Sequence, residues 1–192
     1  MPTTPDPREF TKLPPGLPVP TDDGACDHLL NSRIPSVPLP STAGRTVDLS
    51  AEPGRVVAYF YPMTGTPGVA LPAGWDAIPG ARGCTPQSCA FRDHDAEIRA
   101  LGATVFGVSA QSPAEQAEFA GRVHLPFELL SDERLALAGA LRLPLFTAGG
   151  RTLIRRLTLI LSAGVIEKVF YPVFPPDANA GEVVRWLAER GR

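Results

Sequence analysis

The sequence predicts an α/β protein in which helices flank a central mixed β-sheet. Strand-like apolar runs and helix-like segments alternate from residue 55 to about residue 140. Further on, a tight turn separates two apolar runs, and the last segment has apolar residues at helical spacing. Strands that alternate with helices pair in parallel, whereas strands joined by a tight turn pair antiparallel. The two patterns together indicate a mixed sheet.

Proline content separates an N-terminal segment from the rest of the chain. Residues 1–26 contain seven prolines and are predicted to form an extended arm with no core of its own. The folded domain is therefore expected over residues 27–192. A small β-hairpin is predicted between Ile34 and Leu49, with its turn near Ala43-Gly44, and its prolines favour an edge position.

The central elements follow in order, and each has a boundary signal. The apolar run 55–61 predicts a buried strand, and a helix is expected from about 86 to 101. After a strand at 104–109, Ser112 is expected to cap a helix. A proline follows at the first helical position, and Glu115 completes a capping box with Ser112.

The C-terminal elements complete the pattern. A short strand at 127–130 precedes a helix that is expected to begin at Asp132, a good N-cap residue. A hairpin with strands at 157–161 and 165–171 follows, and Asp177 is expected to cap the last helix. The order βαβαβα and then ββα is the layout of a thioredoxin-like fold with one extra strand–helix insertion.

Residues 62–83 interrupt this pattern with a long loop rich in proline and glycine. A loop of this length in a compact domain is usually functional or mobile. It leads directly to Cys84, so we expect it to lie near any active site there. Trp75 is the aromatic residue of this loop, and two interpretations stay open: a lid over Cys84 or a structural anchor.

The composition excludes several classes of function. A net charge of −2 with mixed signs provides no basic surface for nucleic acid. No apolar stretch has membrane-spanning length, and the N-terminus lacks a signal-peptide profile. We therefore expect a cytoplasmic protein that binds neither nucleic acid nor membranes. We also expect no cofactor. No metal site is expected either, because His94 has no second His or Cys at ligand spacing.

The chain has three cysteines, which is too few for a disulfide scaffold. Cys84 is predicted at a helix N-terminus, where the partial positive charge of the backbone N–H groups favours a thiolate. Cys89 lies five residues further on in the same predicted helix. Cys26 stands apart in an Asp-rich segment whose carboxylates should raise its pKa, so we interpret it as a bystander.

Several short motifs occur together over roughly residues 28–190. They are Tyr59-Phe60-Tyr61-Pro62, Thr66-Pro67-Gly68, Gly83-Cys84-Thr85 with Cys89-Ala90-Phe91-Arg92-Asp93, Leu125-Pro126-Phe127 with Leu130-Ser131-Asp132, and Arg156-Leu157-Thr158-Leu159. As a set they resemble the peroxiredoxins, specifically the bacterioferritin comigratory protein (PrxQ) type.

This resemblance implies a cofactor-free enzyme that reduces hydrogen peroxide and organic hydroperoxides. Cys84 matches the peroxidatic cysteine and Cys89 the resolving cysteine, and the two would form an intramolecular disulfide. Arg156 matches the family's catalytic arginine, which would stabilise the thiolate and hold the peroxide. Thioredoxin, or a glutaredoxin-like dithiol, would reduce the disulfide. Relatives of this type are often monomers.

The sequence departs from the family motif just before Cys84. The motif places a threonine three residues, and a proline seven residues, before the peroxidatic cysteine. These positions are Ala81 and Ala77 here. The motif's Pro-x-x-x-Thr pattern instead ends at Thr66, and an insertion of about 15 residues follows Gly68.

The insertion leaves the family's threonine without an obvious counterpart. Thr66, or else Thr64, would have to fold back to reach the peroxidatic cysteine. Thr85 is a further candidate, and two interpretations stay open for it. Its hydroxyl either donates a hydrogen bond near the thiolate or only begins the helix.

Helix geometry constrains the implied disulfide. In an ideal helix the Cα atoms of residues five apart are separated by about 8.7 Å. A disulfide requires less than about 7 Å. We therefore expect the first turn of the helix, around residues 83–90, to unwind after Cys84 is oxidised.

Two other functions stay open. A thioredoxin-like disulfide oxidoreductase, or a thiol redox sensor, would need no peroxide specificity. Such proteins normally use a C-x-x-C motif, whereas the spacing here is C-x4-C. The third possibility is a scaffold that the inserted loop has made inactive.

Overall fold

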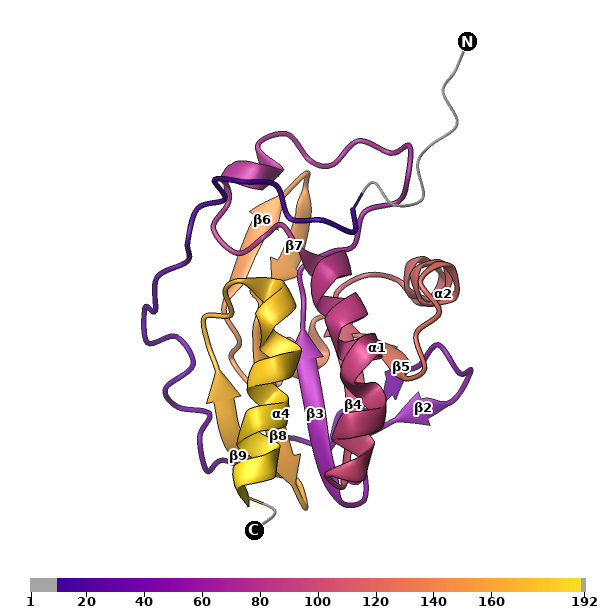
Figure 1. The fold of residues 1–192 in the computed structure, drawn as a ribbon, viewed down its shortest axis with the longest axis vertical. Coiled ribbons are helices and arrows are strands. Elements are labelled where there is room, and N and C mark those ends of the chain that lie inside the picture. The colour runs from indigo at the N-terminus through magenta and orange to yellow at the C-terminus, as the bar shows by residue number, and fades with distance from the viewer. Residues whose placement is uncertain (1–9, 191–192) are drawn as a thin grey trace.

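A five-stranded mixed sheet forms the centre of the protein, seen in a computed structural model that describes residues 10–190 (Figure 1). The strand order is β5-β4-β3-β8-β9. The strands are β3 (Arg55–Phe60), β4 (Ala103–Ser109), β5 (Glu128–Ser131), β8 (Leu157–Ser162) and β9 (Val165–Phe170). Strands β3, β4 and β5 are parallel, and β8 is antiparallel to both β3 and β9. The predicted mixed sheet is confirmed.

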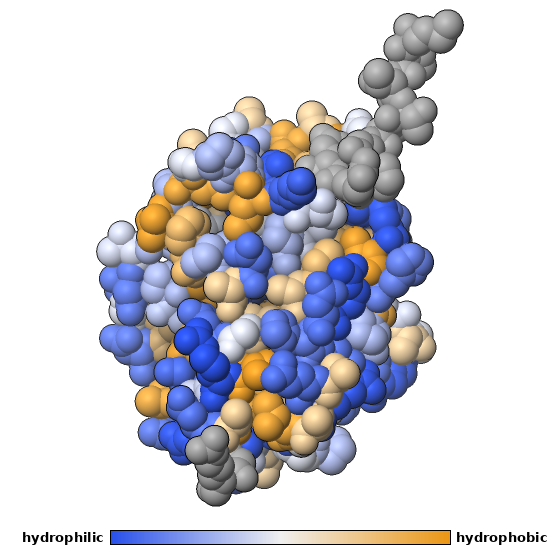
Figure 2. Space-filling model, viewed as in Figure 1, coloured by the Kyte–Doolittle hydropathy of each residue, from blue (hydrophilic) through white to orange (hydrophobic). Residues whose placement is uncertain are grey.

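Helices cover both faces of this sheet. They are α1 (Cys84–Ala100), α2 (Pro113–Arg122), α3 (Ala136–Ala140) and α4 (Asn179–Arg190). Helices α1 and α4 lie side by side on one face (Figure 1). Figure 2 shows that the outward sides of this layer are mostly hydrophilic, with hydrophobic residues in small groups.

The alternation of side chains along β3 builds two cores. Val57 and Tyr59 belong to the core beneath α1 and α4. Their neighbours Ala58 and Phe60 belong to the opposite core, with α3 and the segment that contains Cys26. Successive side chains of a strand point to opposite faces, so a run buried on both faces has to be apolar throughout.

Helix boundaries follow local signals, but the starts of three helices differ from those predicted. The capping box between Ser112 and Glu115 is present as predicted. Helix α1 begins at Cys84, two residues before the predicted start, because Gly83 at its N-cap adopts a left-handed φ of 102°. Helix α3 begins at Ala136 and not at Asp132, whose carboxylate accepts hydrogen bonds from two backbone N–H groups further on.

The last helix also begins later than its predicted cap. Asp177 lies within a short 3-10 turn, Pro176–Ala178, and α4 follows from Asn179. Val183 and Leu187 of α4 are fully buried, whereas Val184 and Trp186, which were also expected on its inner face, are partly buried against the same core.

Two hairpins lie outside the main sheet. The predicted N-terminal hairpin is present but short, with β1 (Leu39–Pro40) antiparallel to β2 (Thr46–Val47). The hairpin of β6 (Leu145–Ala148) and β7 (Arg151–Ile154) was not predicted. Strand β6 is mostly exposed, so it lacks the apolar signal that marks a buried strand.

The long loop and the N-terminal segment lie against each other at one end of the molecule (Figure 1). The loop contains a 3-10 turn at Trp75–Ala77 and otherwise has no regular structure. Phe10 of the predicted arm is buried, and a Cβ added at Gly65 would lie 2.8 Å from its ring. The arm from Phe10 onward therefore packs on the domain, while residues 1–9 lie outside the described part.

Between residues 10 and 190, no helix is both long and apolar enough to cross a membrane.

Candidate active site

Cys84 is the first residue of α1, and its side chain is only 3% exposed. The helix leaves the backbone N–H groups of its first turn without intrahelical partners. Gly83 provides no capping side chain, so those groups of Cys84 and Thr85 are not satisfied by a side-chain cap. The local field at this end of the helix favours negative charge on the sulfur.

Arg156 brings a second positive group to the same sulfur. It lies between β7 and β8, its side chain is buried, and its Nη2 atom donates to Cys84 Sγ at 3.1 Å. The predicted contact between Arg156 and Cys84 is thus present. The neighbouring Arg155 instead lies over the ring of Phe146, 5.8 Å from its centroid.

The guanidinium of Arg156 also holds the end of the insertion. It donates to three consecutive backbone carbonyls, those of Gly80 at 3.3 Å, Ala81 at 3.1 Å and Arg82 at 3.2 Å. Arginine presents its donors in a rigid planar fork, so contacts in several directions fix its orientation. One buried side chain therefore positions both the thiol and the chain that leads to it.

A buried polar network stands behind Arg156. The Nη1 group of Arg156 donates to the Oε1 atom of Gln87, whose Nε2 donates to Asn179 Oδ1 at 3.1 Å. Thr158 donates to the same Asn179 oxygen at 2.7 Å. Sequence reasoning missed Gln87, although its place three residues after Cys84, on the same face of the helix, was a usable signal.

A small cavity, here called the inner hollow, lies in front of Cys84. Its volume is about 10 Å³, close to the room that one water molecule needs. It is lined by Phe10, Met63, Gly65, Leu71, Trp75, Arg82, Gly83, Cys84 and Thr85. Thr85 is the residue in this lining that carries a hydroxyl group.

The two threonines expected to fold back do not line the inner hollow. Thr66 is exposed and lines a neighbouring cavity with Glu115 and Arg151. Thr64 is buried, and its hydroxyl donates to Gln111 at 3.0 Å. The geometry therefore brings Thr85, and neither Thr64 nor Thr66, to the inner hollow.

The position three residues before Cys84 carries a carbonyl contact in place of a threonine hydroxyl. Ala81 is fully buried, and its backbone oxygen lies 3.6 Å from Cys84 Sγ. The same oxygen accepts a hydrogen bond from Arg156. At this position the insertion thus places a backbone carbonyl, and no threonine side chain, beside the sulfur.

Cys89 lies in the same continuous helix and is half-buried. Burial raises the pKa of its thiol, and the nearby Arg92 guanidinium partly opposes this. All three cysteines are free thiols. With the helix intact, ideal geometry keeps the Cα atoms of Cys84 and Cys89 about 8.7 Å apart, beyond disulfide range.

Cys26 is distant from Cys84 in the sequence, and its thiol has a different electrostatic environment. Burial raises the pKa of its thiol to about 12, with further contributions from Asp23, Asp22 and Asp27. The prediction that its surroundings raise its pKa is confirmed. Burial is the larger cause, which the sequence did not show.

Trp75 combines the two roles that were left open. Its side chain is 4% exposed, and its ring lies 6.1 Å from that of Phe146, as expected of an anchor. It also lines the inner hollow, as expected of a residue that covers Cys84.

His94 pairs with Glu97, and residues 10–190 hold no group of three potential metal-ligating side chains.

Comparisons with known proteins agree with this geometry. The redoxin family model matches residues 29–184. Chloroplastic peroxiredoxin Q of Oryza sativa subsp. japonica is 36% identical over 158 residues, covering 81% of this chain and 65% of the rice protein. This chain therefore spans a little under two thirds of the rice relative. Chloroplastic peroxiredoxin Q of Sedum lineare is 36% identical over 81% of this chain and 76% of its own length.

The solved structures support the same grouping. Peroxidoxin BcpB from Mycobacterium tuberculosis superposes with a TM-score of 0.67 at 26% identity, over 83% of this chain and 96% of that one. The sheet order, the helix that begins at Cys84 and the matched sequences agree on a thioredoxin-like domain. The chain belongs to the redoxin family, as a peroxiredoxin of the PrxQ type.

Proposed function

We propose that this protein is a thiol-dependent peroxidase that reduces hydrogen peroxide and organic hydroperoxides. The observation that carries the proposal is the 3.1 Å contact between Cys84 Sγ and Arg156 Nη2, at the base of a cavity with room for about one water molecule. A thiolate beside a fixed cation, at a helix N-terminus, is suited to attack a small electrophile. Membership of the redoxin family supports the same reaction.

The first step oxidises Cys84. The thiolate sulfur attacks the distal peroxide oxygen, the O–O bond breaks, and an S–O bond forms. The sulfur becomes a sulfenic acid, and the leaving oxygen takes up a proton and departs as water or an alcohol. Arg156 stabilises the thiolate before the attack and the negative charge on the leaving oxygen during it.

The remaining hydrogen-bond donors near the reacting sulfur come from the start of α1. The backbone N–H groups of Cys84 and Thr85 point out of the helix N-terminus, where charge develops in the attack. Thr85 lines the inner hollow, and in this proposal its hydroxyl supplies the hydrogen bond that the missing motif threonine would have made. We assign this role to Thr85 and not to Thr66.

The second step joins Cys84 to Cys89. The Cys89 thiol displaces the sulfenic oxygen as water, and an S–S bond forms. Because the intact helix holds the two residues too far apart, the first turn of α1 unwinds in this step. That turn carries Gln87, so unwinding also releases the hydrogen bonds between Gln87, Arg156 and Asn179.

A dithiol then reduces the disulfide and returns both cysteines to thiols. Thioredoxin, or a glutaredoxin-like protein, is the proposed partner. Such a protein carries an accessible dithiol, which can reduce the Cys84–Cys89 disulfide by thiol–disulfide exchange. We further propose a cytoplasmic monomer that binds neither nucleic acid nor membranes.

The competing function is disulfide exchange without peroxide. Burial of Cys84 argues against it, because a protein disulfide is far larger than the inner hollow in front of the sulfur. Reduction of insulin disulfides measures this activity directly.

The test is peroxide turnover with thioredoxin, thioredoxin reductase and NADPH. We expect Cys84→Ser to abolish turnover, because no other thiol faces the inner hollow. We expect Cys89→Ser to accumulate a sulfenic acid that dimedone traps at Cys84, with little turnover. Cys26→Ser is the matched control and should retain the wild-type rate.

Turnover that survives in Cys84→Ser, or a wild-type protein that reduces insulin but consumes no peroxide, would overturn the proposal.

A further inference from the structure

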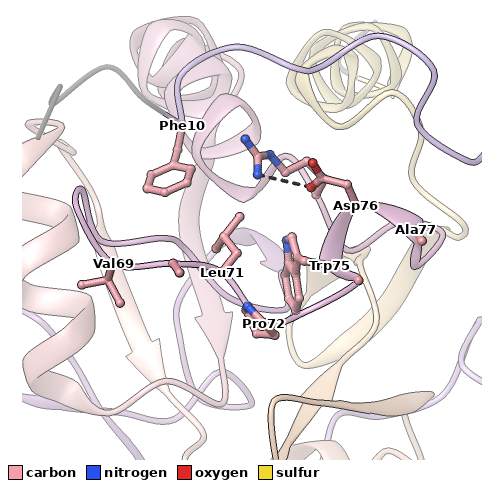
Figure 3. A pocket seen from close by; sticks show the side chains of 10 residues that line it. Phe10, Val69, Leu71, Pro72, Trp75, Asp76 and Ala77 are labelled. Atoms are coloured by element: carbon pink, nitrogen blue, oxygen red, sulfur yellow. Dashed lines mark hydrogen bonds and ion pairs between the residues drawn. The ribbon is translucent and has the colours of Figure 1, made fainter.

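A second, larger cavity opens beside the inner hollow, and we call it the outer hollow. Its volume is about 510 Å³, within the range of sites that hold small organic molecules (Figure 3). It is lined by Phe10, Val69, Ala70, Leu71, Pro72, Gly74, Trp75, Asp76, Ala77 and Arg82. Nine of these ten residues lie in the insertion, and Phe10 of the N-terminal arm is the tenth.

The outer hollow adjoins the reactive sulfur. Four residues line both cavities: Phe10, Leu71, Trp75 and Arg82. A molecule whose reactive end occupies the inner hollow would therefore place the atoms next to that end between these four side chains. The inner hollow has room for about one water-sized group, so a larger substituent would lie outside it.

The walls of the outer hollow have a definite chemistry. Figure 3 shows Phe10 and Trp75 on either side of Leu71, with Pro72 next to Trp75 and Val69 on the side of Phe10. Two aromatic rings and aliphatic side chains form the apolar part of the lining, which can pack against a flat apolar group, while Asp76 and Arg82 contribute its charged part.

The charged residues of the outer hollow are paired. Arg82 Nη1 lies 3.2 Å from Asp76 Oδ1, and the Arg82 guanidinium lies 5.4 Å from the centre of the Phe10 ring. The guanidinium is thus held between a carboxylate and a ring. It forms part of the wall and leaves no unpaired charge that an apolar ligand would have to cover.

We propose that the insertion makes this protein selective for hydroperoxides that carry a bulky apolar, preferably aromatic, substituent. The peroxide group enters the inner hollow, and the substituent occupies the outer hollow between Phe10 and Trp75. The inference rests on the proposed peroxidase function and adds to it the substrate class and the residues that select it.

The insertion is the reason for attributing selectivity to this chain. In the family motif the peroxidatic cysteine directly follows the Thr-Pro-Gly segment, so a chain that follows the motif has no residues equivalent to 69–83. Here, this segment builds the outer hollow, and its last residues are held by Arg156. The cavity is therefore fixed to the same side chain that positions Cys84.

The first experiment compares kcat/KM for cumene hydroperoxide and for hydrogen peroxide. Two variants change the outer hollow in different ways: Val69→Asp makes its wall polar, and Ala70→Trp fills it. Both residues are exposed, so folding should tolerate the changes. We expect the ratio of the two kcat/KM values to fall about tenfold in each variant.

Leu30→Asp is the matched control, because Leu30 is 50% exposed and lies outside both hollows. Its ratio should equal that of the wild type. A ratio unchanged in both Val69→Asp and Ala70→Trp, including an equal fall for both peroxides, would overturn the inference.

A second experiment needs no turnover. The unreactive product alcohol, 2-phenylpropan-2-ol, is titrated into the protein while tryptophan fluorescence is followed. We expect a saturable change in the wild type that is absent in Trp75→Phe, where Trp186 alone remains, and weaker in Val69→Asp. No saturable change in the wild type would overturn the inference.

The two experiments separate the two proposals. Turnover of both peroxides with an unchanged ratio and no binding of the alcohol would overturn the selectivity and leave the peroxidase standing. Saturable binding of the alcohol without turnover of either peroxide would overturn the peroxidase, and the selectivity with it.

Discussion

Cys84 and Cys26 are nearly equally buried, with side chains 3% and 4% exposed, yet their surroundings are opposite. A guanidinium donates to the sulfur of Cys84 at 3.1 Å. Three aspartates surround Cys26, and together with burial they raise its pKa to about 12. A glycine with a left-handed φ precedes each cysteine: Gly83, at 102°, lies directly before Cys84, and Gly24, at 72°, lies two residues before Cys26. Exposure therefore does not distinguish them.

The difference teaches that the charged partner decides what a buried thiol can do. Removal from water disfavours a thiolate at either site. At Cys84 a cation and a helix N-terminus offset this cost, whereas at Cys26 nearby carboxylates add to it. A buried cysteine becomes a nucleophile only where the fold supplies a compensating charge.

The largest expected effect is in thiol labelling. At pH 8 we expect iodoacetamide to modify Cys84 about 1,000-fold faster than Cys26, because a thiol with a pKa near 12 is almost entirely protonated there. Peptide mass spectrometry over a time course gives both rates in the same sample. Since the two side chains are equally buried, access does not explain such a difference.

Arg156→Met provides the matched variant for that comparison. Without the guanidinium, labelling of Cys84 should slow by about 100-fold and approach the rate of Cys26. Arg156→Lys keeps the charge and should slow it less. If Cys84 in Arg156→Met reacts at the wild-type rate, the charged partner does not explain the contrast.

A second, smaller effect concerns the two glycines. Alanine at either position has to adopt a positive φ, which costs about 1 kcal/mol. At Gly83 the new Cβ would also lie 2.4 Å from Pro176 Cγ and 2.7 Å from Leu13 Cδ2. At Gly24 it would meet the carboxylate oxygen of Asp27 at 3.1 Å, and that side chain can rotate away.

We therefore expect Gly83→Ala to lower the free energy of unfolding by about 3 kcal/mol and Gly24→Ala by about 1 kcal/mol. Urea denaturation of the two variants and the wild type measures both changes. Equal losses would mean that the segment before Cys84 is as adaptable as the one before Cys26.

The smallest expected effect is in the pH dependence of stability. Folding raises the pKa of Cys26 from 9.0 to about 12, so the folded state holds this proton more tightly than the unfolded state. The resulting stability is complete below about pH 9 and is lost as the pH rises toward 12. By pH 10 the loss should be about 1 kcal/mol or less, once solvent screening is allowed for.

Cys26→Ala should therefore flatten the decline in unfolding free energy between pH 8 and pH 10. The range ends at pH 10 because burial also raises the pKa of Tyr59 and Tyr61, whose titration begins to contribute there. Parallel slopes for the variant and the wild type would show that Cys26 is not the group that titrates.

Local signals predicted much of the fold. The apolar run of β3, the capping box at Ser112 and the hairpin of β8 and β9 each depend on residues close together in the chain. The hairpin of β6 and β7 was missed, since its strands are short and β6 is mostly exposed. Its burial depends on Trp75 and other residues of the insertion, which no local pattern could indicate.

The candidate site, like the fold, was predicted where its residues belong to local motifs and missed where they depend on distant contacts. Cys84, Cys89 and Arg156 could be predicted from motifs, because each motif is a short segment with its own spacing. Thr66 was expected near Cys84 from its motif, but the insertion separates the two, and Thr85 lines the inner hollow instead. Gln87 and Asn179 were missed because their role depends on a buried contact between α1 and the start of α4.

The sequence by itself determined the strand and helix order, the thiol at a helix N-terminus and the family, because these depend on composition and on spacing along the chain. Only the tertiary structure decided which buried polar groups hold Arg156 in place, which threonine lines the inner hollow and what the insertion encloses. The physical reason is distance along the chain. Arg156 is 72 residues from Cys84, and Phe10 reaches the outer hollow from the N-terminal arm. Such contacts form only when the whole core has folded.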